Sequence, residues 1–187
     1  MIMWRERIAR LAALALLCTP AAACEPLVTV WGSVGVTVND SGGLVFVGVW
    51  CEGAPDSMRI SEEPFPAGGL NVLYEREGLA ENSSATLDAS APAPWRLTEG
   101  VPAFADGVSY SAGMGKLGER SDDRAVVFRP EDVRGRVTPG EVLFASLTGD
   151  GDETATIGGF EAAVWQACRA TAPPASTGGA SNPTKPG

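Results

Sequence analysis

The chain has 187 residues, with 14 Lys and Arg against 23 Asp and Glu for a formal charge of −9, and it contains no histidine. The lack of imidazole excludes Ser-His-Asp and Cys-His catalysis and every His-ligated metal centre. The acidic balance argues against nucleic acid and against electrostatic attachment to anionic lipid, because both bind basic surfaces. Apolar residues make up 44% of the chain, which is enough for one packed domain.

The first 23 residues have the pattern of an export signal. Three arginines within the first ten residues form a basic start, and an apolar run from Leu11 to Cys18 follows, ended by Pro20. This run is too short to cross a bilayer, which takes roughly 20 residues. We therefore expect residues 1–23 to be a cleaved signal peptide and the mature protein to act outside the cytoplasm.

The residues around the expected cleavage point also match a second sequence pattern. Ala21, Ala22 and Ala23 precede Cys24, and this segment resembles the lipobox of bacterial lipoprotein precursors, although Ala21 stands where Leu, Val or Ile is common. The resemblance covers only the first 24 residues. It implies that the Cys24 thiol receives a diacylglyceryl group and anchors the protein to the outer face of the cell membrane. The same alanines also fit ordinary cleavage after Ala23, which would give a secreted protein.

The number of cysteines bears on the same question. After residues 1–23 are removed, three cysteines remain, at positions 24, 51 and 168. An odd number is unusual in an oxidising compartment, and it is explained if Cys24 carries lipid while Cys51 and Cys168 form a disulfide. That disulfide would close a loop of 117 residues, for which the chain-entropy model gives about 4 to 5 kcal/mol of stabilisation. Without lipid, Cys24 would need another partner.

The body of the chain, residues 24–170, shows mainly the two-residue alternation of strands. Residues 27–38 place valines on one face, residues 39–43 have turn composition, and residues 44–51 are apolar on both faces, as in a central covered strand. Weaker strands are predicted at 58–60, 70–74, 125–128, 142–146 and 156–168, and loops at 80–94 and 113–116. We expect a mainly β fold, a single antiparallel sandwich or barrel-like domain.

Two segments within this β-rich pattern are also compatible with a short helix. Residues 138–141 match a capping box with proline at the first helical position. Residues 159–170 have a helix-favouring composition, with apolar residues four apart from Phe160 to Cys168, so a helix there competes with the predicted strand. Residues 171–187 contain no large apolar side chain, which predicts a disordered Pro/Gly/Ser/Thr tail.

A group of acidic residues near position 150 has the spacing of a calcium loop. Asp150, Asp152, Thr154 and Glu161 fall at positions 1, 3, 5 and 12 of an EF-hand-like segment, and oxygen ligands at those offsets suit Ca²⁺. Ala155 occupies position 6, where such loops need glycine, and a solvated acidic turn explains the same residues. We expect no metal or cofactor and keep these four residues as calcium candidates.

Aromatic and acidic residues offer two further kinds of site. Four tryptophans could stack on sugar rings, but we expect them to be core or partly buried residues: Trp31, Trp50, Trp95 and Trp165. A glycosidase needs two carboxylates opposed across a cleft. The adjacent acidic pairs at 62–63, 122–123 and 131–132 are instead typical of solvated loops.

These observations favour an exported, non-enzymatic protein of the cell envelope, anchored through Cys24 and stapled by a Cys51–Cys168 disulfide. It would be a binding or structural module whose ligand, a protein or a glycan, is not specified by the sequence. Two alternatives stay open. One is a secreted, carboxylate-dependent hydrolase of envelope polysaccharide, and the other is a calcium-stabilised adhesion module.

Overall fold

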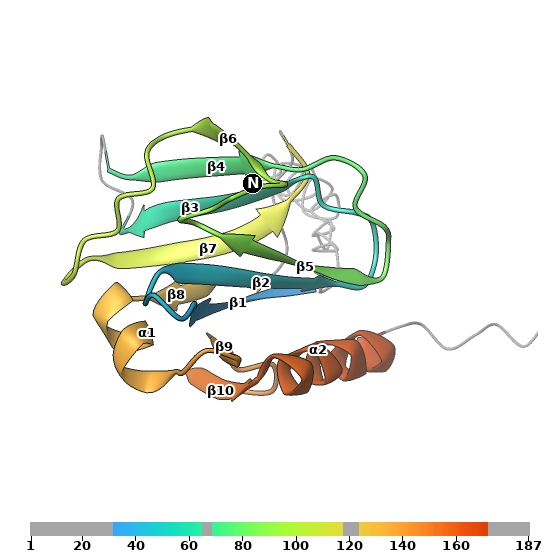
Figure 1. Ribbon diagram of the computed structural model, residues 1–187. Helices are drawn as coiled ribbons and strands as arrows, with labels where there is room; N and C mark the ends of the chain where they lie inside the picture. The colour runs from blue at the N-terminus through green and yellow to red at the C-terminus, as the bar shows by residue number, and fades with distance from the viewer. Residues whose placement is uncertain (1–31, 65–68, 118–123, 172–187) are drawn as a thin grey trace, which may run out of the picture.

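The computed structural model describes residues 32–64, 69–117 and 124–171 (Figure 1). The predicted signal peptide, Cys24, Trp31, the acidic pair at 122–123 and the predicted tail beyond residue 171 lie outside the described residues.

Two five-stranded antiparallel sheets pack face to face (Figure 1). The first sheet has the order β10 (Asp152–Thr156), β9 (Glu141–Ala145), β1 (Gly32–Val38), β2 (Leu44–Trp50) and β5 (Ser83–Asp88). The second has the order β6 (Arg96–Glu99), β4 (Asn71–Glu75), β3 (Ser57–Glu63), β7 (Ser109–Gly115) and β8 (Val126–Phe128). The expected mainly β sandwich is thereby confirmed, and the sheets do not close into a barrel.

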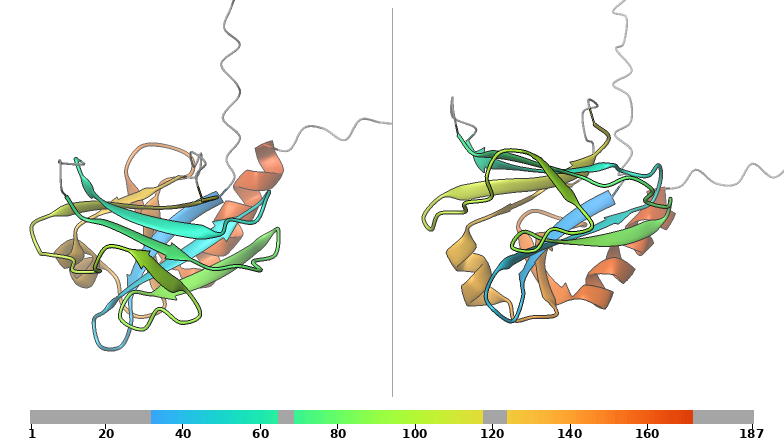
Figure 2. Two further views of the ribbon diagram at one scale, coloured as in Figure 1. Left: turned by 90° about the horizontal axis from the view of Figure 1, so that it is seen from above. Right: turned by 45° about the horizontal axis from the view of Figure 1, so that its top comes forward.

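Two helices, α1 (Pro130–Arg136) and α2 (Ile157–Thr171), complete the fold. Figures 1 and 2 show α2 lying along the first sheet, on the side away from the second. None of the helices within the described residues is long and apolar enough to cross a membrane.

The strongest sequence prediction, the first hairpin, is also the centre of the first sheet. β1 and β2 pair in register over seven residues, from Gly32 opposite Trp50 to Val38 opposite Leu44. Every residue of both strands is buried. β2 is buried on both faces, as its doubly apolar sequence predicts, because one face meets the second sheet and the other meets α2.

Apolar side chains form two separate cores. The larger core fills the space between the sheets and includes Phe46 from the first sheet and Ile60 from the second. The smaller core lies between the outer face of the first sheet and α2, where Phe160 packs against Phe144 with ring centroids 4.9 Å apart. The protein is therefore a sandwich with a helical third layer on one side.

Two predicted loops are strands instead. The polar segment 80–94 contains β5, in which Ala85 and Leu87 point inward and the residues between them face solvent. The segment 113–116 is the end of β7, whose inward residues are buried and whose outward residues are serine and glycine. Both strands were missed because small polar residues on the solvent side dilute the apolar alternation.

The C-terminal part of the chain also differs from the sequence prediction. The predicted strand at 156–168 is wrong, because β10 ends at Thr156 and α2 begins at Ile157, so the helical alternative is the correct one. α1 was not predicted. The acidic segment that follows β9 contributes β10, which pairs with β9 over five residues.

The capping-box pattern at 138–141 forms one of the two capping-box hydrogen bonds, that of the Thr138 N–H to the Glu141 side chain, and it does not start a helix. The Thr138 backbone N–H and hydroxyl donate to the Glu141 carboxylate at 3.0 and 2.8 Å, and the Glu141 N–H donates to the Thr138 carbonyl. These bonds hold the pKa of Glu141 below its ordinary value. Gly140 has φ of +94°, which no helix tolerates, so the chain turns into β9.

The predicted disulfide between Cys51 and Cys168 is present, with Cα atoms 6.0 Å apart and 117 residues between them in sequence. Cys51 directly follows β2, and Cys168 lies in the last turn of α2. The disulfide therefore fixes the end of the helix to the central strand that its apolar face covers.

Asn39 and Asp88 join the first hairpin turn to the end of β5. The Asn39 side-chain carbonyl accepts from the Ser41 and Gly43 N–H groups at 3.0 and 2.9 Å, and its amide donates to the Asp88 carboxylate at 2.9 Å. Burial raises the pKa of Asp88, but hydrogen bonds from Ser90 and Asn39 outweigh burial and hold this pKa below its ordinary value.

Asp88→Asn is expected to cost about 1 kcal/mol of unfolding free energy at neutral pH, a modest value because the carboxylate is only half-buried. A lowered pKa stabilises the fold above the unfolded value of about 3.9 and stops doing so as pH falls through the folded value. Urea unfolding at about pH 7 and about pH 3 should therefore show a smaller penalty at the lower pH. Asp40→Asn, at an exposed position of the same turn, is the control. An equal penalty at both pH values would contradict the prediction.

Candidate functional site

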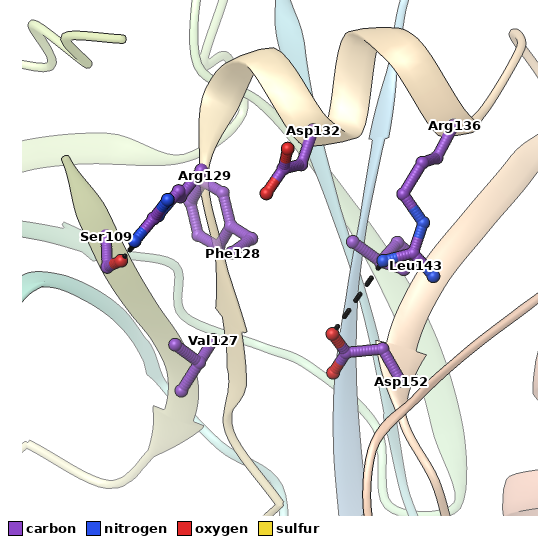
Figure 3. A pocket seen from close by; sticks show the side chains of 8 residues that line it. All are labelled: Ser109, Val127, Phe128, Arg129, Asp132, Arg136, Leu143 and Asp152. Atoms are coloured by element: carbon purple, nitrogen blue, oxygen red, sulfur yellow. Dashed lines mark hydrogen bonds and ion pairs between the residues drawn. The ribbon is translucent and has the colours of Figure 1, made fainter. Parts of the chain in front are cut away.

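A cavity of about 160 Å³ opens where α1, β10 and the β7–β8 edge of the second sheet meet (Figure 3). It is lined by Ser109, Val127, Phe128, Arg129, Asp132, Arg136, Leu143 and Asp152. Four of these residues are charged, two of each sign, so the cavity carries no net formal charge.

Local sequence explains how α1 presents its side chains to this cavity. Pro130 at the start of the helix follows Arg129, and proline suits the first helical turn because the N–H that it lacks would have no helical partner there. Asp132 and Arg136 are four residues apart and share one face. Val133 is buried in the main core and holds the helix against the sheets.

The strand β8 supplies the floor and one wall. Its alternation places Val126 and Phe128 in the core and leaves Val127 52% exposed beside the cavity. Ser109 comes from the neighbouring strand β7, and Leu143 and Asp152 come from β9 and β10 of the other sheet. The site is thus assembled from both sheets and the helix between them.

Three of the four charged side chains contact another lining residue, and the fourth, Asp132, does not. The Arg129 Nε donates to the Ser109 hydroxyl at 3.1 Å, and an Arg136 nitrogen lies 3.9 Å from an Asp152 carboxylate oxygen. Figure 3 shows the Asp132 carboxylate pointing into the cavity between the two arginines. Within the described parts of the chain, the Asp132 carboxylate has no hydrogen bond or ion pair to another residue.

The side chains of this cavity combine hydrogen-bond donors and acceptors. The cavity offers guanidinium donors and a carboxylate acceptor side by side, which can hold one small polar group. The only hydroxyl in it, that of Ser109, is bonded to an arginine, which stays protonated and cannot serve as a general base. A nucleophile with its activating base is therefore not formed by the residues that line the cavity.

The calcium candidates do not come together. Asp152 and Thr154 lie within β10, a regular strand, and not in the loop that the EF-hand-like spacing requires. Glu161 lies on α2, where its carboxylate accepts from the Ser84 hydroxyl of β5 at 2.7 Å. In the described ranges no group of three or more His, Cys, Asp or Glu residues could hold a metal ion.

Two of the four tryptophans are core residues, as expected. Trp50 is 2% exposed and Trp95 is 4% exposed, and their indole N–H groups donate to the carbonyls of Ala80 and Thr86. Trp165 is partly buried, which agrees with the same prediction, and it packs against the smaller core. It is therefore the described tryptophan that keeps a ring surface available to a ligand.

The adjacent acidic pairs at 62–63 and 131–132 have mostly local roles. The Glu62 carboxylate accepts from the Leu70 N–H, and the Glu131 carboxylate accepts from the Gly107 N–H. Asp132 is the exception, because it faces the cavity. No sequence pattern indicated that Arg129 and Arg136 line a cavity, or that Asp132 and Asp152 line it together.

Neither the family models, nor the curated proteins, nor the solved structures searched contain a match to this chain.

Proposed function

We propose that this protein is an exported binding module of the cell envelope, without enzymatic activity, anchored to the outer face of the membrane by lipid on Cys24. The observation that supports this most directly is the disulfide between Cys51 and Cys168. It uses two of the three cysteines that follow residue 23, and Cys24 is then the single thiol for which the lipobox-like segment provides a use.

The position of β1 defines how such an anchor would orient the domain. β1 begins at Gly32, eight residues after Cys24, and a fully extended segment of that length spans at most about 28 Å. Gly32 pairs with Trp50, the residue before Cys51. The end of the sandwich that carries the disulfide would therefore lie near the membrane surface, and the opposite end would face away from it.

The test is the intact, unreduced mass of the protein from the membrane fraction of a bacterial host that processes lipoproteins. We expect a chain that starts at Cys24, carries a diacylglyceryl group there and lacks two hydrogens elsewhere. The Cys24→Ala variant should lose the lipid and leave the membrane while keeping the disulfide. A soluble, unlipidated wild-type chain with Cys24 in a second disulfide would contradict the anchor and favour plain secretion.

One observation favours the hydrolase alternative enough to keep it as a second candidate. Asp132 from α1 and Asp152 from β10 line the same cavity, and two carboxylates opposed across a cleft are what glycoside hydrolysis needs. The ion pair of Asp152 with Arg136 weighs against it, because a general acid must be able to carry a proton. Release of reducing ends from cell-wall glycan that both Asp132→Asn and Asp152→Asn abolish would establish the hydrolase.

A further inference from the structure

A second cavity, of about 360 Å³, lies at the disulfide end of the sandwich. It is lined by Cys51, Glu52, Asn82, Trp165, Cys168 and Arg169. These residues come from three separate parts of the chain: the end of β2, the residue before β5, and the last two turns of α2. Its volume is near the lower end of the range for small-molecule sites, so it suits a ligand of one ring.

The wall of this cavity is apolar and rigidly held. Trp165 and Cys168 are three residues apart on α2 and so lie on one side of the helix, where both pack against the smaller core. The disulfide ties that side of the helix to Cys51. The indole ring and the two sulfur atoms therefore keep their positions relative to the sheet, which lowers the entropy cost of binding a ligand there.

The polar groups around this wall are balanced in charge. Glu52 can only accept hydrogen bonds, Arg169 can only donate them, and the Asn82 amide can do both. Such a set satisfies a ligand that has several hydroxyl groups and no net charge. It does not favour an anion or a cation, because each charge in the cavity is offset by the other.

We infer that this cavity binds one pyranose ring of a neutral glycan, with the apolar face of the sugar stacked on Trp165. A pyranose presents C–H groups on its face and hydroxyls at its rim, which is the complement of an aromatic wall bordered by acceptors and donors. Glu52, Asn82 and Arg169 bond the hydroxyls. The inference rests on the binding role proposed above, whose ligand class it names, and it does not depend on lipid at Cys24.

The experiment titrates the full mature chain, purified in detergent, with three neutral trisaccharides, chitotriose, maltotriose and mannotriose, and with acidic trigalacturonic acid, by isothermal calorimetry. We expect at least one neutral trisaccharide to bind and the acidic one to bind more weakly. Trp165→Ala should weaken binding by about tenfold or more. The matched control is Gln166→Ala, at the exposed neighbouring position of α2, which should leave the affinity unchanged.

Because Trp165 also packs against the smaller core, a second variant keeps the test decisive. Arg169 is exposed, so Arg169→Ala should fold normally and still weaken binding several-fold. The inference is overturned if no neutral trisaccharide binds at about 10 mM, if the acidic one binds best, or if both variants bind like the wild type.

The proposed lipid anchor and the proposed glycan site can be tested independently of each other. Titration of the Cys24→Ala variant shows whether binding survives without lipid, and we expect that it does. Glycan binding by a chain that carries no lipid would overturn the anchor alone. A lipidated chain that binds none of the trisaccharides would overturn the glycan site alone.

Discussion

Replacing Cys51 and Cys168 together by alanine is expected to lower the free energy of unfolding by about 4 to 5 kcal/mol. The disulfide closes a loop of 117 residues, and the chain-entropy model assigns a large loss of freedom to an unfolded chain constrained in that way. Natural domains are stable by only about 5 to 15 kcal/mol, so the variant should lie close to its unfolding threshold.

The measurement is urea unfolding followed by tryptophan fluorescence, with the slope of the transition compared between the two proteins. The wild type unfolded in the presence of a strong reductant is the matched control and should lose the same amount of stability. A loss below about 1 kcal/mol in both cases would mean that the unfolded chain is already compact and that the disulfide adds little.

The second large effect is expected at the other attachment of α2. Phe160→Ala should lower the free energy of unfolding by about 3 to 5 kcal/mol, because the Phe160 side chain has no exposed surface and packs against Phe144. Its removal would leave a cavity between the helix and the first sheet. Gln166→Ala, at an exposed position of the same helix, is the control and should change stability by less than about 0.5 kcal/mol.

Combining the two sets of substitutions shows whether the two attachments of α2 depend on each other. Phe160 holds the first half of α2 and Cys168 holds its end, so both keep the helix on the first sheet. In chains that already lack the disulfide, we expect Phe160→Ala to cost less than it costs in the wild type, because a helix without its tether can detach from the sheet. Equal costs in both backgrounds would show that the two attachments act independently.

The long strands and the disulfide could be predicted from the sequence for clear physical reasons. Residues 32–38 and 44–50 are buried along their whole length, and their sequences show it as a valine at every second position from Val34 to Val38 and as an apolar run from Leu44 to Trp50. The pairing of Cys51 with Cys168 was predicted from the odd number of cysteines that follow the expected signal peptide. Strands with a solvated outer face, such as β5 and β7, have too few apolar residues to stand out.

The sequence patterns that correspond to α1 and to the charged cavity are weaker than those of the long strands. Pro130, followed by two acidic residues and then by Arg134 and Arg136, is the charge order that favours a short helix, and reading it would have placed Asp132 and Arg136 on one face. Nothing in the sequence indicates that Asp152 lies opposite Arg136, because that contact depends on how β10 pairs with β9. Contacts set by sheet register cannot be found by scanning for motifs.

The burial of the individual tryptophans could not be predicted from the sequence either. Composition alone does not separate Trp50, which is buried between the sheets, from Trp165, which is partly open on a helix. The difference arises because residues 157–171 form a helix rather than a strand, so that successive side chains face different directions around its axis.

The covalent link between β2 and α2 also determines what a protease can release. Any single cut in the backbone between residues 52 and 167 falls inside the loop that the disulfide closes. The two fragments then remain one molecule until the disulfide is reduced. A domain held to a cell surface at its N-terminal end would keep its C-terminal half, helix included, after such a cut.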